Sequence, residues 1–358
     1  MRITSVETWQ DSLPLVRPYT IAFKTVSAVD LHFVRIITDS GTIGLGSAAP
    51  TDVTGESSEA CAAALADGGR DILIGRDPRH LRPQTRDLTA RLGSTPAARA
   101  ALDMALYDLV ACHLGVPVLD MLGRCHDAME TSVTIGIKPA DETLREASEY
   151  IEGGFRCLKI KLGHDAAEDK DRLLQLRAHV GPEVRIRVDA NQGYTPGKAL
   201  MLHSLAASLD LELIEQPLPA SDIDAMRHMP NQSRQVMAAD ESLHDTADAI
   251  RLAKRPRPFG IYNIKLMKCG GISGGRAIAA VAESAGIDLM WGCMDESVVS
   301  IAAALHAAYS CHATRYIDLD GSFDLSRDAM EGGFRLERGK LFVLDRPGLG
   351  VRCPPCAS

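Results

Sequence analysis

A series of short apolar segments, repeated from about residue 130 onward, constrains the fold of this chain more than any other feature. Eight such segments occur, and each ends in polar residues and is followed by a stretch with a helical pattern. Their starts recur about every 25 residues, which is the length of one strand-helix unit, and eight such units close into a parallel barrel. The sequence therefore predicts an α/β fold, a (β/α) TIM barrel with its active site at the carboxyl ends of the strands. The predicted strands are 133–137, 158–162, 184–189, 211–215, 235–240, 261–266, 287–291 and 315–320.

The sequence on either side of the barrel predicts a second domain. Three helical stretches follow segments with a strand pattern at 3–8, 31–38 and 43–46. This order is typical of an α+β domain. The helical stretches are 59–66, 79–92 and 97–114. We predict an N-terminal α+β domain over 1–125, a barrel over 126–321 and a C-terminal segment, 322–358, that returns to the first domain.

Composition excludes several classes of protein. Hydrophobic residues make up 46% of the 358 residues and charged residues 24%, so the chain can bury a core and is not disordered. The net charge of −8 opposes nucleic-acid binding. No segment approaches the roughly 20 apolar residues that cross a membrane, and the start lacks a signal sequence. Nine scattered cysteines suit a reducing, cytoplasmic compartment, and the Cys353/Cys356 pair is given no function.

Two lysines on the second predicted strand are candidate catalytic groups. Lys159 and Lys161 are two residues apart, so they share one face of the strand, opposite Leu158, Ile160 and Leu162. We expect the lysines to point into the barrel, where repulsion between two ammonium groups lowers a pKa toward the range of a general base. The alternative is a pair of solvated lysines on an edge strand.

Carboxylates end the third, fourth and fifth predicted strands. These residues are Asp189, Glu215 and Asp240. Three acids at one barrel mouth could not stay ionised together without a cation, and oxygen ligands without histidine or cysteine select Mg²⁺. The alternative is three unrelated loop acids or helix caps, but their repetition at matching strand ends favours a magnesium site.

The sixth predicted strand supplies a second candidate base. Lys265 shares a face with Asn263 and Met267, whereas Lys268 falls on the other face and is expected to be structural or to support a site residue from outside the site. Strands two and six lie across the barrel from each other. Lys161 and Lys265 would then approach one substrate carbon from opposite sides, an arrangement that implies inversion of configuration.

Further acids occur near the ends of the last two predicted strands. Asp318 and Asp320 share one face and are candidates for holding a cationic substrate group such as an α-ammonium, the alternative being a helix cap and a turn aspartate. Asp295 and Glu296 follow strand seven. They either select a positively charged side chain or cap the next helix.

Together these motifs resemble the muconate-lactonizing branch of the enolase superfamily over nearly the whole chain. The shared motifs are Lys159-Ile-Lys161, the three acids, Glu215-Gln-Pro, Asp240-Glu-Ser and Asn263-Ile-Lys265, and the Asp318-Leu-Asp320 pair narrows the resemblance to dipeptide epimerases. The resemblance implies a capping domain over a modified TIM barrel, one Mg²⁺ per subunit and a homo-oligomer. It also implies acid/base roles for Lys161 and Lys265, a supporting role for Lys159, and a dipeptide whose C-terminal α-carbon is inverted. Thr134 joins the expected substrate-binding residues.

The substrate side chains are less constrained. Epimerases of Ala-Glu dipeptides are expected to use a basic group from the early capping loop, and Lys24 could serve. Asp52 and Asp295 instead predict an acidic rim, which would attract Lys- or Arg-containing dipeptides. The prediction is a preference for cationic dipeptides, with an L-Ala-D/L-Glu epimerase as the alternative.

Other functions share parts of this pattern. Muconate cycloisomerase, o-succinylbenzoate synthase and N-acylamino-acid racemase would use the same metal and lysines, but the strand-eight aspartates favour a substrate with a free ammonium. A metal-dependent hydrolase would normally need a His-x-His strand, which none of the eleven histidines supplies. A non-catalytic barrel should have lost a base or a metal ligand.

Overall fold

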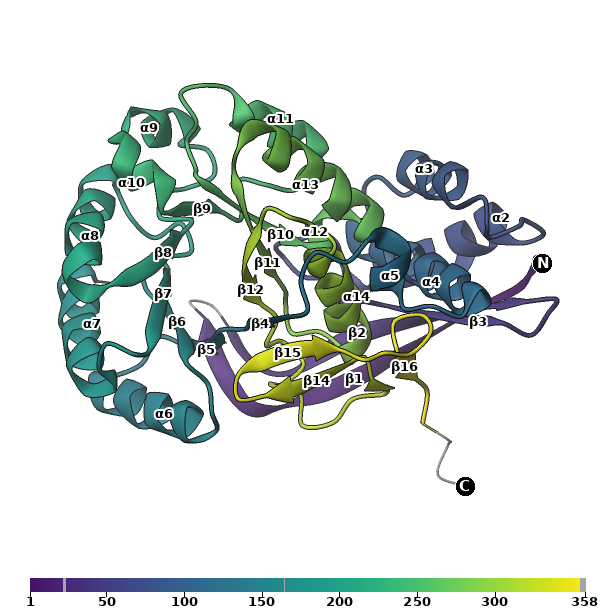
Figure 1. The fold of residues 1–358 in the computed structure, drawn as a ribbon, viewed down its shortest axis with the longest axis horizontal. Helices are drawn as coiled ribbons and strands as arrows, with labels where there is room; N and C mark the ends of the chain where they lie inside the picture. The colour runs from purple at the N-terminus through teal and green to yellow at the C-terminus, as the bar shows by residue number, and fades with distance from the viewer. Residues whose placement is uncertain (22–23, 164, 355–358) are drawn as a thin grey trace.

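The chain folds into a barrel and a side lobe, with two long strands running beneath the barrel from the lobe (Figure 1). The computed structural model describes residues 1–21, 24–163 and 165–354. The predicted fold class, a TIM barrel with an N-terminal α+β capping domain, is confirmed. Within these residues, no helix is long and apolar enough to cross a membrane.

The capping domain is a three-stranded antiparallel sheet covered by helices. Strands β1 and β2 form a hairpin far longer than the predicted segments, because pairing continues to Ile21 and Lys24. The elements are β1 (Ile3–Ile21), β2 (Lys24–Thr38), β3 (Ile43–Ala48), α1 (Ser58–Ala63), the π-helical turn η1 (Ala64–Gly68), α2 (Gly69–Leu73), α3 (Leu81–Arg91), α4 (Pro96–Leu114) and α5 (Val118–Leu122). The hairpin reaches the barrel helix α6 (Ala140–Glu152), where Arg17 Nη2 lies 2.5 Å from Glu149 Oε2.

Helix α4 is the core of the capping domain. Every residue from 97 to 111 is buried, so the helix is enclosed by protein on all sides. Gly44 and Gly46 in β3 permit its close approach, since a Cβ on Gly46 would overlap the carbonyl oxygen of Ala101. The glycines of this strand thus fix the distance between the sheet and the helix.

Eight parallel strands form the barrel, in the order β12-β11-β10-β9-β8-β7-β6-β5. Their apolar runs are buried on both faces, as parallel barrel strands require. The ring is closed between β5 and β12 by a bridge from Thr131 to Ile317. The strands are β5 (Val133–Ile135), β6 (Cys157–Lys161), β7 (Arg185–Asp189), β8 (Leu211–Glu215), β9 (Met237–Ala239), β10 (Ile261–Lys265), β11 (Asp288–Gly292) and β12 (Thr314–Asp318).

All eight strands occur where the sequence predicts them, although five end one or two residues early. Strand β9 stops before Asp240, and β12 stops at Asp318, so Asp320 lies in the following loop. The barrel helices are α6, α7 (Ala166–Val180), α8 (Pro196–Leu209), α9 (Ile223–His228), α10 (Asn231–Gln235), α11 (Thr246–Ala253), α12 (Leu266–Cys269), α13 (Ile272–Ala285) and α14 (Val298–Tyr309).

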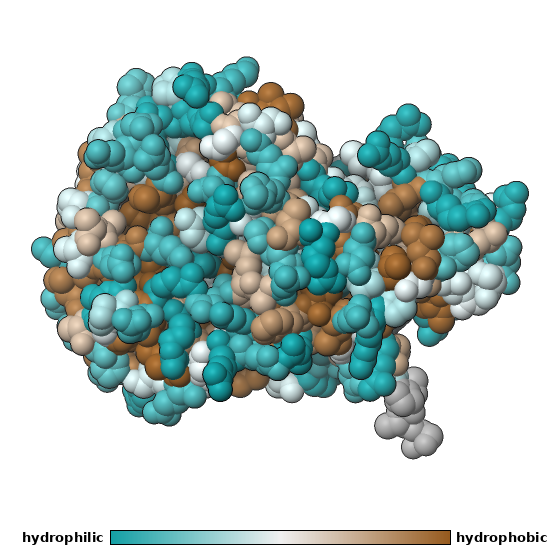
Figure 2. Space-filling view, in the orientation of Figure 1, coloured by the Kyte–Doolittle hydropathy of each residue, from teal (hydrophilic) through white to brown (hydrophobic). Residues whose placement is uncertain are grey.

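The C-terminal segment contacts both units. Its short strands are β13 (Glu331–Gly332), β14 (Phe334–Glu337), β15 (Lys340–Val343) and β16 (Val351–Arg352), and β15 pairs with β4 (Ala128–Glu130) at the start of the barrel. Leu349 N donates to Asp108 of α4, and Ser326 N donates to Pro14 of β1. Figure 2 shows a largely polar surface on the visible face, with separated apolar patches and a notch between the barrel and the lobe.

Candidate active site

Three buried carboxylates meet at the carboxyl ends of neighbouring strands. Asp189 and Glu215 are register partners in β7 and β8, and Asp240 directly follows β9. Their exposed fractions are 0%, 0% and 2%. Such burial is costly for carboxylates unless positive charge compensates it, so the arrangement requires cations close by.

Four lysines supply positive charge to these carboxylates. Lys159 Nζ lies 2.8 Å from Glu215 Oε2, 2.8 Å from Asp318 Oδ2 and 3.2 Å from Asp189 Oδ2. Lys161 Nζ donates to Asp189 Oδ2 at 2.8 Å and to Asn191 Oδ1 at 3.0 Å. On the other side, Lys265 Nζ lies 2.9 Å from Asp240 Oδ2, and Lys268 Nζ pairs with Asp240 Oδ1.

The strand order places Lys161 and Lys265 across the barrel from each other. Lys161 ends β6 and Lys265 ends β10, and three strands separate β6 from β10 in either direction around the ring. The carboxylates of β7, β8 and the β9 loop lie along one of these arcs. The geometry therefore places two amines on opposite sides of an acidic cluster.

Burial and the neighbouring carboxylates act in opposite directions on the pKa values of the buried lysines. Burial opposes ionisation of Lys159, but Asp318, Glu215 and Asp189 outweigh it and raise the pKa of this lysine well above its ordinary value. Lys159 therefore stays charged, because three carboxylates surround its ammonium group. Likewise, burial is outweighed at Lys265 by Asp240 and Glu215, which raise its pKa.

The carboxylates themselves respond unequally. Burial and the neighbouring Asp189 raise the pKa of Glu215 to about 7. At Asp240, burial acts in the same direction but is outweighed by Lys265 and Lys268, so the pKa falls well below its ordinary value. Whether each of these carboxylates is ionised thus depends on how much positive charge lies beside it.

The donor set fits a hard divalent cation in its chemistry. All three side chains offer carboxylate oxygens, and lysine ammonium groups lie against each of them. In the present arrangement, no three acidic, histidine or cysteine side chains of the described residues gather closely enough to enclose an ion. The carboxylates are instead drawn toward the lysines, so binding a cation would require them to turn from ammonium to metal.

The other predicted residues occupy varied positions. Asp318 Oδ2 accepts a hydrogen bond from Lys159 Nζ at 2.8 Å, and Asp318 Oδ1 accepts one from Ser132 Oγ at 2.6 Å. Asp320 Oδ2 accepts from the backbone N of Thr134 at 2.8 Å. Burial and the charge of Asp318 raise the pKa of Asp320 to about 6.

The rim residues divide between the interior and the surface. Glu296 is 2% exposed and accepts a hydrogen bond from Met294 N at 2.8 Å. Asp295 is half-buried, and Asp52 is exposed in the turn after β3. Lys24 begins β2, but its side chain, like Cys356, lies outside the described part of the chain.

Sequence reasoning missed several contributors. Asn263 Nδ2 donates to Glu215 Oε1 at 2.8 Å, and Lys268 contacts Asp240 although strand parity placed it on the other face. Asp324 was also missed, and burial together with Asp320, Asp295 and Glu146 raises its pKa to about 8. Its spacing after Asp318 and Asp320 was the one available signal.

Comparison with known proteins gives matches over almost the entire chain. Residues 3–123 match the mandelate racemase/muconate lactonizing enzyme N-terminal domain, and residues 142–355 match the enolase C-terminal domain-like family. An L-Lys-D/L-Arg epimerase of Methylococcus capsulatus is 54% identical, covering 99% of this chain and 100% of its own. An L-Ala-D/L-Glu epimerase of Bacillus subtilis is 35% identical, covering 98% and 97%.

Solved structures agree with the sequence matches. The dipeptide epimerase of Methylococcus capsulatus, complexed with Mg and the dipeptide L-Arg-D-Lys, superposes with a TM-score of 0.96 at 54% identity and covers 98% of this chain and 99% of that one. This chain therefore belongs to the mandelate racemase/muconate lactonizing enzyme family of the enolase superfamily.

Proposed function

We propose that this protein is a Mg²⁺-dependent epimerase of dipeptides with cationic side chains. It inverts the α-carbon of the C-terminal residue by moving a proton between that carbon and two lysines. The observation that carries the proposal is the placement of Lys161 and Lys265 on strands half a barrel apart, with buried carboxylates along the arc between them.

Each lysine acts on one face of the substrate carbon. A neutral amine at Lys161 removes the α-proton from one epimer, and the ammonium of Lys265 returns a proton to the opposite face; the roles exchange for the other epimer. Lys265 is suited to donate a proton, because Asp240 and Glu215 favour its ammonium form despite its burial. Lys159 remains charged among three carboxylates and holds them in place.

Asp189, Glu215 and Asp240 would hold the metal ion. Bound Mg²⁺ supplies positive charge that stabilises the negative charge developing on the substrate carboxylate as the α-proton leaves. The support is the all-oxygen donor set on adjacent strands and the Mg²⁺ complex of the 54% identical relative. Lys161 and Lys265, the two proposed proton carriers, now contact Asp189 and Asp240. If these carboxylates bound Mg²⁺ instead, both amines would be free to contact the substrate.

An acidic cluster favours the cationic preference. We define this acidic cluster as Glu146, Asp295, Asp320 and Asp324. Burial and Asp318 raise the pKa of Asp320 to about 6, and burial together with Asp320, Asp295 and Glu146 raises that of Asp324 to about 8. An incoming cationic side chain would relieve this unfavourable negative charge. Two relatives at 54% and 50% identity are named L-Lys-D/L-Arg epimerase, which supports the same choice.

The test is isotope exchange in deuterium oxide with Mg²⁺-loaded protein. L-Lys-L-Arg, L-Arg-L-Lys and L-Ala-L-Glu are incubated separately, and deuterium at each α-carbon is followed by NMR and mass spectrometry. We expect exchange and loss of chirality at the C-terminal residue of the cationic dipeptides. Exchange of Ala-Glu with inert cationic dipeptides would reverse the substrate assignment.

Single lysine variants separate the two bases. Lys161→Ala should abolish exchange from one epimer at the C-terminal residue and Lys265→Ala from the other, because each removes the amine on one face. Lys170→Ala, at an exposed position on α7, is the matched control. Exchange that persists in the Lys161→Ala/Lys265→Ala double variant would refute the two-base assignment.

The cellular setting is also proposed. The nine cysteines are consistent with a cytoplasmic enzyme. A homo-oligomer remains our proposal, and light scattering coupled to size-exclusion chromatography measures it directly.

A further inference from the structure

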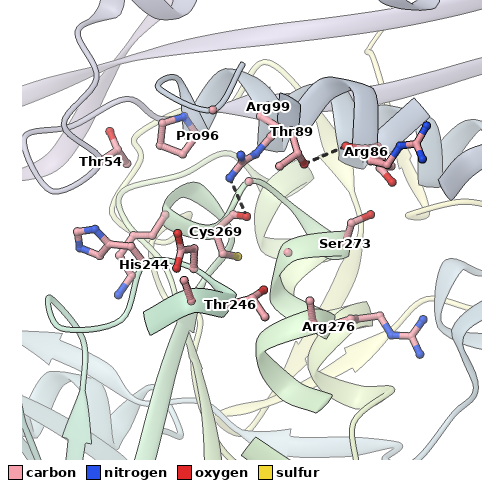
Figure 3. A pocket seen from close by; sticks show the side chains of 18 of the residues that line it. Thr54, Arg86, Thr89, Pro96, Arg99, His244, Thr246, Cys269, Ser273 and Arg276 are labelled. Atoms are coloured by element: carbon pink, nitrogen blue, oxygen red, sulfur yellow. Dashed lines mark hydrogen bonds between the residues drawn. The ribbon is translucent and has the colours of Figure 1, made fainter. Parts of the chain in front are cut away.

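A second cavity lies between the capping domain and the barrel, outside the strand-end site. It has a volume of about 940 Å³ and is bounded by α3 and α4 on one side and by α12, α13 and the start of α11 on the other. Figure 3 shows Arg99 on the capping side, with Ser273 and Arg276 on the barrel side. This volume is in the range of small-molecule sites.

The cavity is strongly basic although the whole chain is acidic. Its described lining has a single carboxylate, Asp245, against five basic side chains, whereas the chain carries a net charge of −8. The five basic residues are Arg82, Arg86, Arg99, Lys268 and Arg276.

Arg99 provides an unused donor in the cavity wall. Its side chain is only 9% exposed, and its Nη2 donates to Cys269 O at 3.1 Å. Its Nε makes no hydrogen bond within the described part of the chain. The guanidinium lies against Gly270, where any side chain would overlap it. The buried guanidinium therefore adds a fixed positive charge to the wall of the cavity.

Two arginines from different domains line the cavity together with Tyr107. Burial and Asp103 raise the pKa of Tyr107, while the charges of Arg276 and Arg82 oppose the increase, so both guanidinium groups act on this phenol. Arg82 lies on α3 of the capping domain and Arg276 on α13 of the barrel. Positive charges on the two sides of a cavity repel each other, and a bound anion would reduce that repulsion.

We propose that this basic cavity, lined by Arg82, Arg99 and Arg276, binds a small anion that carries phosphate or carboxylate groups. Guanidinium groups suit either ligand because they donate paired hydrogen bonds to planar or tetrahedral oxyanions. The bound anion joins the capping domain to the barrel. It is distinct from the dipeptide substrate and does not depend on the proposed epimerase activity.

The basic cavity is connected to the strand-end site through one side chain. Lys268 lines the cavity, and its Nζ also donates to the backbone oxygen of Asp240 at 2.6 Å. The lining includes neither Lys161, Lys265 nor the carboxylates of β7 and β8. An anion in the cavity would therefore attract a lysine that helps to hold Asp240.

The test is calorimetric titration of the full-length protein with inorganic phosphate and, separately, with citrate, at constant ionic strength in a buffer without oxyanions. We expect saturable binding of at least one anion, and the stronger binder identifies the ligand as phosphate-like or polycarboxylate. Arg276→Gln and Arg82→Gln should each weaken binding about tenfold, which corresponds to about 1.4 kcal/mol. Arg276→Lys keeps the charge and should bind more tightly than Arg276→Gln.

Arg352→Gln is the matched control, because this exposed arginine pairs with Glu331 near the C-terminus and does not line the cavity. Thermal unfolding gives a second readout: the anion should raise the melting temperature of the control more than that of Arg276→Gln. Absence of binding by both anions, or equal weakening in Arg352→Gln, would overturn the proposal. So would binding that is lost in Lys161→Ala and Lys265→Ala but kept in the arginine variants, because the anion would then occupy the strand-end site.

Discussion

At the scale of single residues, the site depends on lysine and carboxylate groups that are buried together. Lys159 is 3% exposed and touches carboxylates from three strands, β7, β8 and β12. A cation in this position compensates charges that burial alone would make very unfavourable. Its role is therefore structural and electrostatic at once.

Replacing Lys159 by methionine should destabilise the fold. The change leaves Asp189, Glu215 and Asp318 without their shared ammonium, and loss of one partner from a buried ion pair costs about 3–5 kcal/mol. Urea unfolding measures the loss, and Mg²⁺ should restore part of it by supplying positive charge. Lys170→Met, at an exposed site, should have little effect. An unchanged unfolding midpoint in Lys159→Met would contradict this account.

Glu215→Gln should impair metal binding. The amide has no negative charge and one fewer oxygen than the carboxylate, and Mg²⁺ prefers charged oxygen ligands. Calorimetry should show Mg²⁺ affinity lowered at least roughly tenfold, or about 1.4 kcal/mol. Asp171→Asn, at an exposed position on α7, is the control. Equal Mg²⁺ affinity in wild type and Glu215→Gln would remove Glu215 from the ligand set.

Residue-level prediction identified the carboxylates but placed Lys268 on the wrong face, for a structural reason. The alternation of side chains predicts faces correctly only while the chain stays extended. Strand β10 ends at Lys265 and α12 begins at Leu266, so the helical turn redirects Lys268 toward Asp240. Similarly, repulsion between Lys159 and Lys161 is a local inference, whereas the carboxylates around Lys159 come from distant strands.

At the scale of elements, the barrel strands were predictable and the capping hairpin was not. Parallel barrel strands are buried on both faces, which leaves continuous apolar runs in the sequence. Strand β1 instead extends through Asp11, Ser12 and Arg17 to Ile21. These polar residues interrupt the apolar pattern that would predict a strand. Its pairing with β2 is a tertiary feature that local sequence does not specify.

The contact between β3 and α4 gives a prediction at this scale. Gly46→Ala should destabilise the capping domain by about 1–3 kcal/mol, because the new methyl group would overlap the carbonyl oxygen of Ala101. Thermal unfolding monitored by circular dichroism measures the effect. Gly197→Ala in α8, where the added methyl group meets no atom within 4 Å, should be neutral or stabilising. Equal stability of the two variants would exclude close packing at β3 as the cause.

At the scale of the whole molecule, we propose that the domains divide as the sequence suggests, at 1–125, 126–321 and 322–358, with the last segment serving the capping domain. Asp108 supports this division because it accepts from Leu45 N of β3 at 2.8 Å and from Leu349 N of the C-terminal segment at 2.7 Å. The pairing of β15 with β4 shows that the segment also contacts the beginning of the barrel.

Asp108 should make stability depend on pH. Burial raises its pKa from 3.8 to about 6, so between these values the folded state binds more protons than the unfolded state. Its contribution is therefore present at low pH and lost as the pH rises from about 4 to about 6, by about 3 kcal/mol. Urea unfolding across this range should show a stability difference between wild type and Asp108→Asn that falls by that amount.

The amide of Asp108→Asn has one acceptor oxygen for two backbone donors, which adds a constant loss of about 1 kcal/mol at every pH. Asp71→Asn, at an exposed site on α2, should run parallel to wild type. A constant difference between wild type and Asp108→Asn from pH 4 to pH 6 would show that the buried carboxylate does not titrate there.

The joint between β5 and β12 has a consequence for how such a protein diversifies. Seven neighbouring strand pairs are laddered, whereas these two strands are joined by the Thr131–Ile317 bridge. Thr134, Asp318 and Asp320 gather at this joint, while Lys161 and Lys265 stand on laddered strands. The proposed substrate-binding residues thus lie at a seam where substitutions disturb few ladder hydrogen bonds, and both proposed bases lie on fully paired strands.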